Sequence, residues 1–299
     1  MTEAVERKQL LLSRMEGLRR VPTVPAVLTP LLGYLEQPLE NLDVQKVTDF
    51  LAQDSSLAAQ CLHVANSPLF GRWQQVDSLS TAVVSLGLNH VRDIAMSCGL
   101  LNMLPEKSAS LNPLVFWEHS LGCALICRHL TRNLGLGDPG KAYLAGLLHD
   151  LGIIANMWVL PREFCAAFEL ARAEAIPLHE AEQTILGFTH CDSGRLLAER
   201  WGFAPALIEV VGCHHLPDES APNAHLVALV HIADLLCRLS DLNYGYVEAR
   251  QVNLFEDPGF ALLVQSSKSL KEFDWARLTF ELDSYMDEVH HLVRTIYRG

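Results

Sequence analysis

Apolar residues recur at helical spacing along most of this 299-residue chain. One of these sets lies between residues 44 and 51 and comprises Val44, Val47, Phe50 and Leu51. Residues three and four positions apart lie on one face of a helix, so the set predicts a helix with one buried side. The strict alternation of apolar and polar residues that is typical of a half-buried strand occurs nowhere in the sequence. The pattern therefore predicts an all-α fold.

Capping residues indicate where several helices begin and end. In the first half, Asp43 precedes the helix just described, and Ser80 can cap a helix over residues 81–86. In the second half, Gly187 ends one helix and Thr189 can cap the next. Pro205 then stands near the first position of a further helix, where proline is favoured because its missing N–H is not needed.

Prolines and polar residues divide the sequence further. Residues 1–20 predict one charged amphipathic helix, which two prolines then end. A Ser/Pro-rich stretch at 105–113 is typical of a connection between helical parts. The predicted segments are an N-terminal helix (1–20), an N-terminal helical subdomain (21–112), a second subdomain (113–240) and a C-terminal extension (241–299).

The C-terminal extension contains one strongly amphipathic stretch. Its apolar positions are Phe280, Leu282, Tyr285, Met286, Val289, Leu292, Val293 and Ile296. A helix with such a face needs a covering surface. We expect it to pack back on its own domain, and the alternative is an interface with a partner or in a homodimer.

Charge and hydropathy exclude two classes of partner. The chain has 35 acidic and 23 basic residues, a net charge of -12, and no run of Lys or Arg. It should repel a phosphate backbone, so direct nucleic-acid binding is not expected. No stretch of 18 residues is both uncharged and apolar enough to span a bilayer, and the N-terminus lacks the order of a signal peptide. We expect a cytoplasmic protein without membrane contact.

The eight cysteines are scattered singly, and none forms a Cys-x-x-Cys pair. In a cytoplasmic chain this pattern is typical of buried, reduced thiols. Cys191 and Cys213 each adjoin a histidine, which leaves metal or oxidant chemistry open at those two positions.

A His-Asp pair lies inside an otherwise apolar run, GLLHDLGII, at His149 and Asp150. Burying both groups is costly unless each has a partner, and a metal ion can serve both. A hydrogen-bonded pair at a helix end is the alternative.

Other histidines and acids in apolar helical contexts favour the metal. Together with the pair, they comprise His119, His149, Asp150, His190, His214, His215 and Asp234. Imidazole and carboxylate suit Fe, Mn, Zn, Ni or Co, and a shared carboxylate commonly bridges two ions. The remaining histidines are expected to be structural: His63, His90, His129, His179, His225, His231, His290 and His291.

The motifs occur in an order that resembles a known family. They are VPTVPAV, DFLAQDSSLAAQCLHVANSPLFG, STAVVSLGLNHVRDIAM, FWEHS, AGLLHDLG, LGFTHCDSGRLLAERWGF and CHH. Over residues 15–240 the chain resembles the HDOD module, an all-helical branch of the HD superfamily of metal phosphohydrolases and a relative of the HD-GYP cyclic-dinucleotide phosphodiesterases. Many HDOD proteins have lost the metal-binding positions and are considered non-enzymatic, whereas this chain keeps the full set.

The resemblance implies a division of ligands between two ions. It assigns one ion to His119, His149, Asp150 and Asp234, and the second to Asp150, His190, His214 and His215. Iron is the metal we expect, with Mn, Ni and Zn as alternatives.

The chain also departs from the phosphodiesterases. Ile153 stands where their HDxGK motif has a lysine that can contact the phosphate, and residues 216–222 replace their GYP signature. Without a cation for the phosphate, the electrostatic stabilisation on which phosphoryl transfer depends is weakened. We expect a regulatory protein that signals through a protein partner. The alternative is a metal-dependent phosphohydrolase with Asp150 as its catalytic carboxylate.

Overall fold

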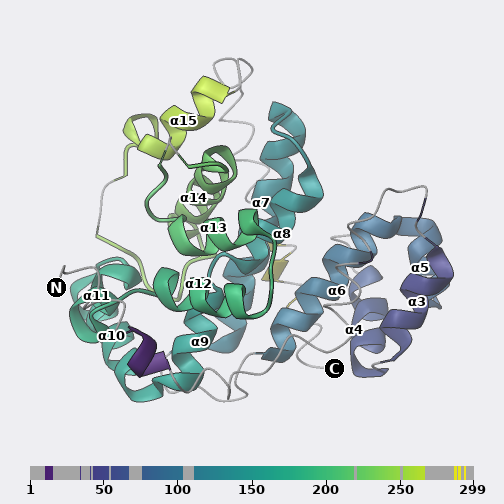
Figure 1. Ribbon diagram of the computed structural model, residues 1–299, viewed down its shortest axis with the longest axis horizontal. Coiled ribbons are helices and arrows are strands. Elements are labelled where there is room, and N and C mark those ends of the chain that lie inside the picture. Colours follow the sequence, from purple (N-terminus) through teal and green to yellow (C-terminus); the bar gives the residue numbers. More distant parts are fainter. Residues whose placement is uncertain are drawn as a thin grey trace. The chain divides into compact units, whose positions relative to one another are not determined.

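The computed structural model describes residues 11–15, 34, 41, 43–53, 55–66, 76–103, 111–218, 221–249, 252–266, 286, 287, 289, 290 and 293. All regular elements in these ranges are helices, which confirms the all-α fold (Figure 1). The chain forms two compact units. The larger unit comprises 1–21 and 105–280, and the smaller unit comprises 22–104 and 281–299. The division into four consecutive segments stays a prediction.

The smaller unit is built from helices that bury one apolar side each. They are α3 (Val44–Ala52), α4 (Ser55–Ala65), α5 (Leu79–Leu86) and α6 (Leu88–Met103). The cap at Asp43 is confirmed, since its carboxylate accepts a hydrogen bond from the backbone N–H of Gln45 at 2.8 Å. The core of the smaller unit contains Leu51, Leu57 and Ile94, each 1% exposed or less.

One predicted cap in this unit is wrong. The helix expected at 81–86 begins at Leu79, and its cap is Ser78 instead of Ser80. Ser78 has the extended backbone that a capping residue needs, and its hydroxyl accepts from the N–H of Thr81 at 3.0 Å. Ser80 is the second residue of the helix, so it cannot be the residue that precedes and caps it.

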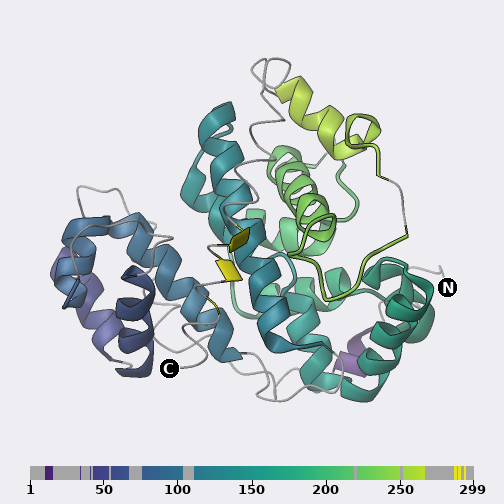
Figure 2. The same ribbon diagram turned by 180° about the vertical axis from the view of Figure 1, so that it is seen from behind.

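The larger unit holds the histidine motifs. Its elements are α7 (Pro113–Leu134), α8 (Pro139–Leu148), α9 (Leu151–Val159), α10 (Pro161–Glu174), α11 (Leu178–Leu186), α12 (His190–Arg200), α13 (Pro205–Cys213), α14 (Ala224–Arg238), a 3-10 helix η4 (Leu254–Glu256) and α15 (Pro258–Ser266). Helix α7 lies along α8, and α14 contacts both of them (Figures 1 and 2). Helix α12 packs against both α9 and α13.

The helix boundaries in this unit follow the predicted signals. Gly187 has a φ of +79° and ends α11, which confirms its predicted role, because an L side chain rarely adopts that conformation. Thr189 caps α12, with the Asp192 carboxylate accepting from the Thr189 N–H at 2.9 Å. Pro205 is confirmed at the first turn of α13.

One described stretch, Pro139–Val159, is long and apolar enough by composition to cross a membrane, although it contains the charged residues Lys141 and Asp150 and so is not uncharged. It spans α8 and α9, and 89% of its most apolar window is buried inside the protein. The interior of the larger unit therefore accounts for its hydrophobicity. All eight cysteines are free thiols, as expected.

Two predicted elements fall mainly outside the described residues. Within the expected helix 1–20, residues 11–15 are described and helical, and Arg14 pairs with Glu163 of α10 at 3.2 Å. Of the C-terminal amphipathic stretch, Val289 and Val293 are helical and fully buried. The connection at 105–113 is described only from residue 111 onward.

A close contact between α9 and α12 depends on glycine. A Cβ atom on Gly152 would overlap the carbonyl oxygen of His190 and lie 2.7 Å from the backbone nitrogen of Gly194. Both neighbours are backbone atoms, which cannot rotate away. The absence of a side chain at Gly152 therefore lets the first turn of α12 approach α9.

We predict that Gly152→Ala lowers the free energy of unfolding by about 3 kcal/mol, the upper end for overpacking. This corresponds to a fall in Tm of roughly 6–12 °C, which calorimetry can measure. The control is Ala173→Ser at an exposed position of α10, which should change stability by less than about 0.5 kcal/mol. Equal Tm values for the two variants would contradict the close approach.

Candidate metal centre

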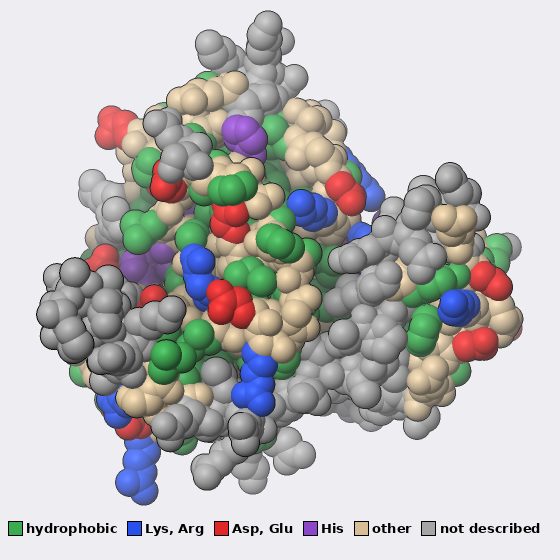
Figure 3. Space-filling model, viewed as in Figure 1, with side chains coloured by type: hydrophobic (Ala, Val, Ile, Leu, Met, Phe, Trp, Pro, Cys, Tyr) green, Lys and Arg blue, Asp and Glu red, His purple; other side chains and the backbone are tan. Residues whose placement is uncertain are grey.

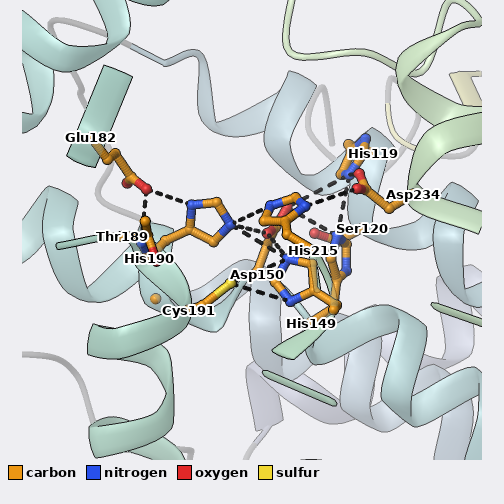
Figure 4. Close-up of polar contacts among 12 residues, drawn as sticks. His119, Ser120, His149, Asp150, Glu182, Thr189, His190, Cys191, His215 and Asp234 are labelled. Atoms are coloured by element: carbon orange, nitrogen blue, oxygen red, sulfur yellow. Dashed lines mark hydrogen bonds and ion pairs between the residues drawn. The ribbon is translucent and has the colours of Figure 1, made fainter. Parts of the chain in front are cut away.

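The seven side chains expected to hold metal lie together inside the larger unit (Figure 4). His119 lies on α7, His149 and Asp150 at the junction of α8 and α9, His190 at the start of α12, His214 and His215 directly after α13, and Asp234 on α14. Six of them are 2% exposed or less, and the His215 side chain is 10% exposed. The structure brings all seven into one buried cluster.

Asp150 lies at the middle of this cluster and faces two sets of imidazoles. Its Oδ2 atom lies 3.0 Å from Nε2 of His149 and 3.6 Å from Nε2 of His119. Its Oδ1 atom lies 3.3 Å from Nε2 of His190 and 3.4 Å from Nε2 of His214. Each carboxylate oxygen therefore belongs to a different half of the cluster. We call the half with His119 and Asp234 the enclosed half, and the half with His190, His214 and His215 the pocket-facing half.

The imidazoles are held so that one nitrogen points inward. Four of them donate an Nδ1–H hydrogen bond to an acceptor outside the cluster. The pairs are His119 with the Leu242 carbonyl (2.7 Å), His149 with the Gly146 carbonyl (2.7 Å), His190 with the Glu182 carboxylate (2.6 Å) and His214 with the Val210 carbonyl (3.2 Å). With the proton on Nδ1, the lone pair of each Nε2 faces the cluster, which is the arrangement of metal-binding histidines.

Two buried polar atoms of the cluster have no hydrogen-bond partner, namely Oδ1 of Asp150 and Nδ1 of His215. His215 lies between the halves, with Nε2 3.0 Å from Nε2 of His190 and Nδ1 3.6 Å from Oδ2 of Asp234. An unsatisfied buried polar atom costs about 1–3 kcal/mol, and a cation beside His190 and His214 would satisfy Oδ1 of Asp150. The donor set, imidazole and carboxylate, therefore fits a transition-metal ion.

The acids of the cluster are charged. Burial raises the pKa of Asp150, but the imidazoles of His149, His214 and His190 outweigh it and hold that pKa well below its usual range. Burial has the same effect on Asp234, where the Arg238 guanidinium and His119 lower the pKa well below its usual range. Both residues are therefore carboxylates at neutral pH, as metal ligands must be.

Sequence reasoning missed Glu182 of α11, which is fully buried. Its Oε2 accepts from the backbone N–H of His190 at 2.7 Å and from the His190 ring, while Oε1 accepts from Asn156 at 3.0 Å. A signal was available, because Leu178, Glu182 and Leu186 stand at i, i+4 and i+8 on one apolar stripe. An acid on such a stripe needs a buried partner.

Two further contacts come from the chain after the last motif. The hydroxyl of Tyr244 hydrogen-bonds Oδ2 of Asp150, and its ring lies 4.4 Å from that of His119. The Nε–H of Arg238 contacts both oxygens of Asp234, at 3.0 and 3.1 Å, and Nη1 donates to Glu248 at 2.9 Å. Tyr244 and Arg238 therefore contact the two carboxylates of the enclosed half. Arg238 carried a sequence signal, because it stands four residues after Asp234 on the same helix. No motif or spacing pointed to Tyr244.

A pocket of about 780 Å³ adjoins the pocket-facing half and is lined in part by His179, Cys191, Arg195 and His215. The His179 ring, expected to be only structural, stacks on His215 at 4.1 Å. Burial and the neighbouring His190 lower the pKa of His179 to about 3, so this ring is neutral.

On the face of the molecule seen in Figure 3, acidic and basic side chains are interspersed, and histidine side chains are exposed among them.

The HDOD domain family matches residues 21–217. The chain belongs to the HDOD family. Among solved structures, an HDOD domain protein of unknown function from Geobacter sulfurreducens is 29% identical, with a TM-score of 0.85, over 98% of this chain and 99% of that one. A candidate phosphohydrolase from Shewanella amazonensis SB2B is 23% identical, with a TM-score of 0.72, over 96% of this chain and 98% of that one, and shares the fold.

Curated relatives of this HDOD protein are longer. An uncharacterised protein of Treponema pallidum is 25% identical over 74% of this chain and 44% of its own length. A protein named ribonuclease Y from Geobacter sulfurreducens is 29% identical over 40% of this chain and 17% of its own length. The HDOD chain thus spans less than half the length of these relatives.

We predict that Glu182→Ala weakens metal binding by about 10–100-fold, the usual effect of removing a carboxylate that orients a ligating histidine. Competition with a chromophoric chelator measures the Kd. Glu174→Ala is the control, because Glu174 is an exposed acid of α10 that does not line the pocket. Equal affinities in the two variants would show that Glu182 does not orient His190 for a metal.

Proposed function

We propose that this HDOD protein is a signal-transduction module that holds transition-metal ions in a buried His/Asp centre and acts through a protein partner. The main support for a metal site is the arrangement of Asp150. Its two oxygens face separate sets of imidazole Nε2 atoms, and Oδ1 lacks any hydrogen bond. A bridging carboxylate between two ions would have this arrangement.

The proposed ligands follow the two halves. His119, His149, Asp150 and Asp234 would hold one ion, and Asp150, His190, His214 and His215 would hold the second. We propose iron, which imidazole and carboxylate ligands suit, with Mn, Ni and Zn as alternatives. A bound ion of this kind makes a coordinated water more acidic and can supply a hydroxide near neutral pH.

The surroundings of the centre favour regulation over hydrolysis. Ile153 is fully buried and apolar, so no cation extends from that position. Among the described residues lining the pocket, Arg195 is the cationic one, and Glu180, Asp192 and Glu199 are acidic. A pocket with this balance repels an anionic phosphate ester.

A metal-dependent phosphohydrolase is the second candidate, and the pocket is the observation that favours it. The pocket reaches His215, so a substrate could meet the pocket-facing half beside the guanidinium of Arg195. The likeness to the candidate phosphohydrolase of Shewanella amazonensis supports the same idea only at the level of fold.

We further propose a cytoplasmic location and no direct contact with nucleic acid, consistent with the net charge of -12. The buried Val289 and Val293 support packing of the C-terminal stretch within the chain over a homodimer interface.

We predict that protein purified without chelators carries metal in near-stoichiometric amount and hydrolyses neither cyclic dinucleotides nor bis(p-nitrophenyl) phosphate. Asp150→Ala should reduce the metal content more than tenfold, because it removes the ligand common to both ions. Elemental analysis and product release, measured on one preparation, check both parts. Glu174→Ala, at an exposed acid of α10, is the control.

Two results would contradict this proposal. If the protein contains little metal after growth in medium supplied with metal, the proposed metal centre is wrong. If the protein hydrolyses either substrate, and Asp150→Ala loses this activity while Glu174→Ala keeps it, the protein is a phosphohydrolase and the regulatory function is wrong.

A further inference from the structure

We propose that Cys191 is a thiolate ligand of the ion in the pocket-facing half. The inference rests on the proposed metal centre and concerns a donor outside its seven residues. Cys191 follows His190 in the first turn of α12, and Figure 4 shows its sulfur directed toward the imidazoles. The ligand atoms of His190, Cys191, His214 and His215 all lie within 4.8 Å of one another.

The distances suit a common ion. Sγ of Cys191 lies 3.8 Å from Nδ1 and 3.9 Å from Nε2 of His214. With metal–nitrogen bonds of about 2.0–2.1 Å and a metal–sulfur bond of about 2.3 Å, an angle of about 110–120° between the bonds, as four- and five-coordinate ions have, separates the two donors by about 3.6–3.8 Å. The observed separation from Nε2 therefore needs to close by only a few tenths of an ångström.

The charge balance of the pocket-facing half is the second reason to place Cys191 among the ligands. The pocket-facing half has three imidazoles and, apart from Cys191, one anionic donor, the unpartnered Oδ1 of Asp150. A buried dication is stable only where nearby anions balance its charge. When the Sγ–metal bond forms, the thiol loses its proton to solvent, and the thiolate supplies the second negative charge. A thiolate also favours iron, zinc or cobalt over harder ions.

Cys123 provides the internal comparison. Its sulfur lies 3.7 Å from Nε2 of His119, and it forms a similar group with His149 and Asp234 in the enclosed half. However, that half already has the Asp234 carboxylate, and Cys123 is fully buried. Cys191 lines the pocket, through which an ion can enter.

The test is the absorption spectrum of the cobalt(II) protein. Metal-free protein loaded with Co(II) should show a near-ultraviolet sulfur-to-cobalt charge-transfer band. Cys191→Ser should lose the band, whereas Cys123→Ser and Cys213→Ser should keep it at equal cobalt content by elemental analysis. Cobalt bound without the band, or a band that persists in Cys191→Ser, overturns the thiolate ligand and leaves the metal centre in place. Failure to bind cobalt at all overturns the centre with it.

A second measurement needs no variant, in case Cys191→Ser does not fold. Iodoacetamide labelling followed by peptide mass spectrometry reports each thiol in the unmodified chain. Bound cobalt should slow alkylation of Cys191 more than tenfold relative to the chelated protein. Cys213 lines the same pocket and should label at the same rate in both forms. Equal labelling of Cys191 in both forms overturns the proposal.

Discussion

The carboxylate of Asp150 is the constraint on which the larger unit depends. It is a charged group with 1% exposure, and its neighbours at 3.0–3.6 Å are four imidazole nitrogens that the hydrogen bonds of their rings turn inward. An isolated buried carboxylate is strongly disfavoured, and the imidazoles of His149, His214 and His190 keep this one ionised. Cations between these donors would also satisfy the unpartnered Oδ1, so metal binding would be linked to folding.

The fold delivers these donors mostly at helix ends. His149 and Asp150 occupy the junction of α8 and α9, His190 opens α12, and His214 follows α13. Backbone groups at helix ends are free to bond side chains, and the nearby carbonyls of Gly146 and Val210 accept the Nδ1–H of two of the rings. The close approach at Gly152 brings the first turn of α12 to Asp150. The same backbone features that end the helices thus orient the donors.

Much of this was predictable from the sequence, and the reason is local chemistry. Polar residues inside apolar helical runs, such as His149 and Asp234, need buried partners, so their position in the sequence, together with the resemblance to the HD superfamily, predicted that they converge. Caps at Asp43 and Thr189 were predictable because the capping hydrogen bond involves neighbours in the chain. The Ser78 cap was missed because Ser78 and Ser80 both precede the apolar residues Ala82 and Val83, and only the backbone conformation shows which serine caps the helix.

The contact of Tyr244 was not predictable for a different reason. Tyr244 reaches the cluster from a turn whose course depends on packing, and no spacing in the sequence encodes that course. Arg238 carried a signal, because it stands four residues after Asp234 on the same helix. Glu182 did carry a signal on its apolar stripe. The proposed role of Cys191 also depends on distances, since a cysteine beside a histidine is equally compatible with a small buried hydrophobe.

In the proposed centre, Asp150 would bridge ions held by two sets of histidines. Anomalous scattering at the absorption edge of the bound metal, from crystals of the protein as purified, locates those ions. We expect peaks beside both oxygens of Asp150, one among His190, His214 and His215 and one beside His119 and His149. Peaks located elsewhere in the chain, or a fully ordered cluster without any peak in metal-containing protein, would contradict it.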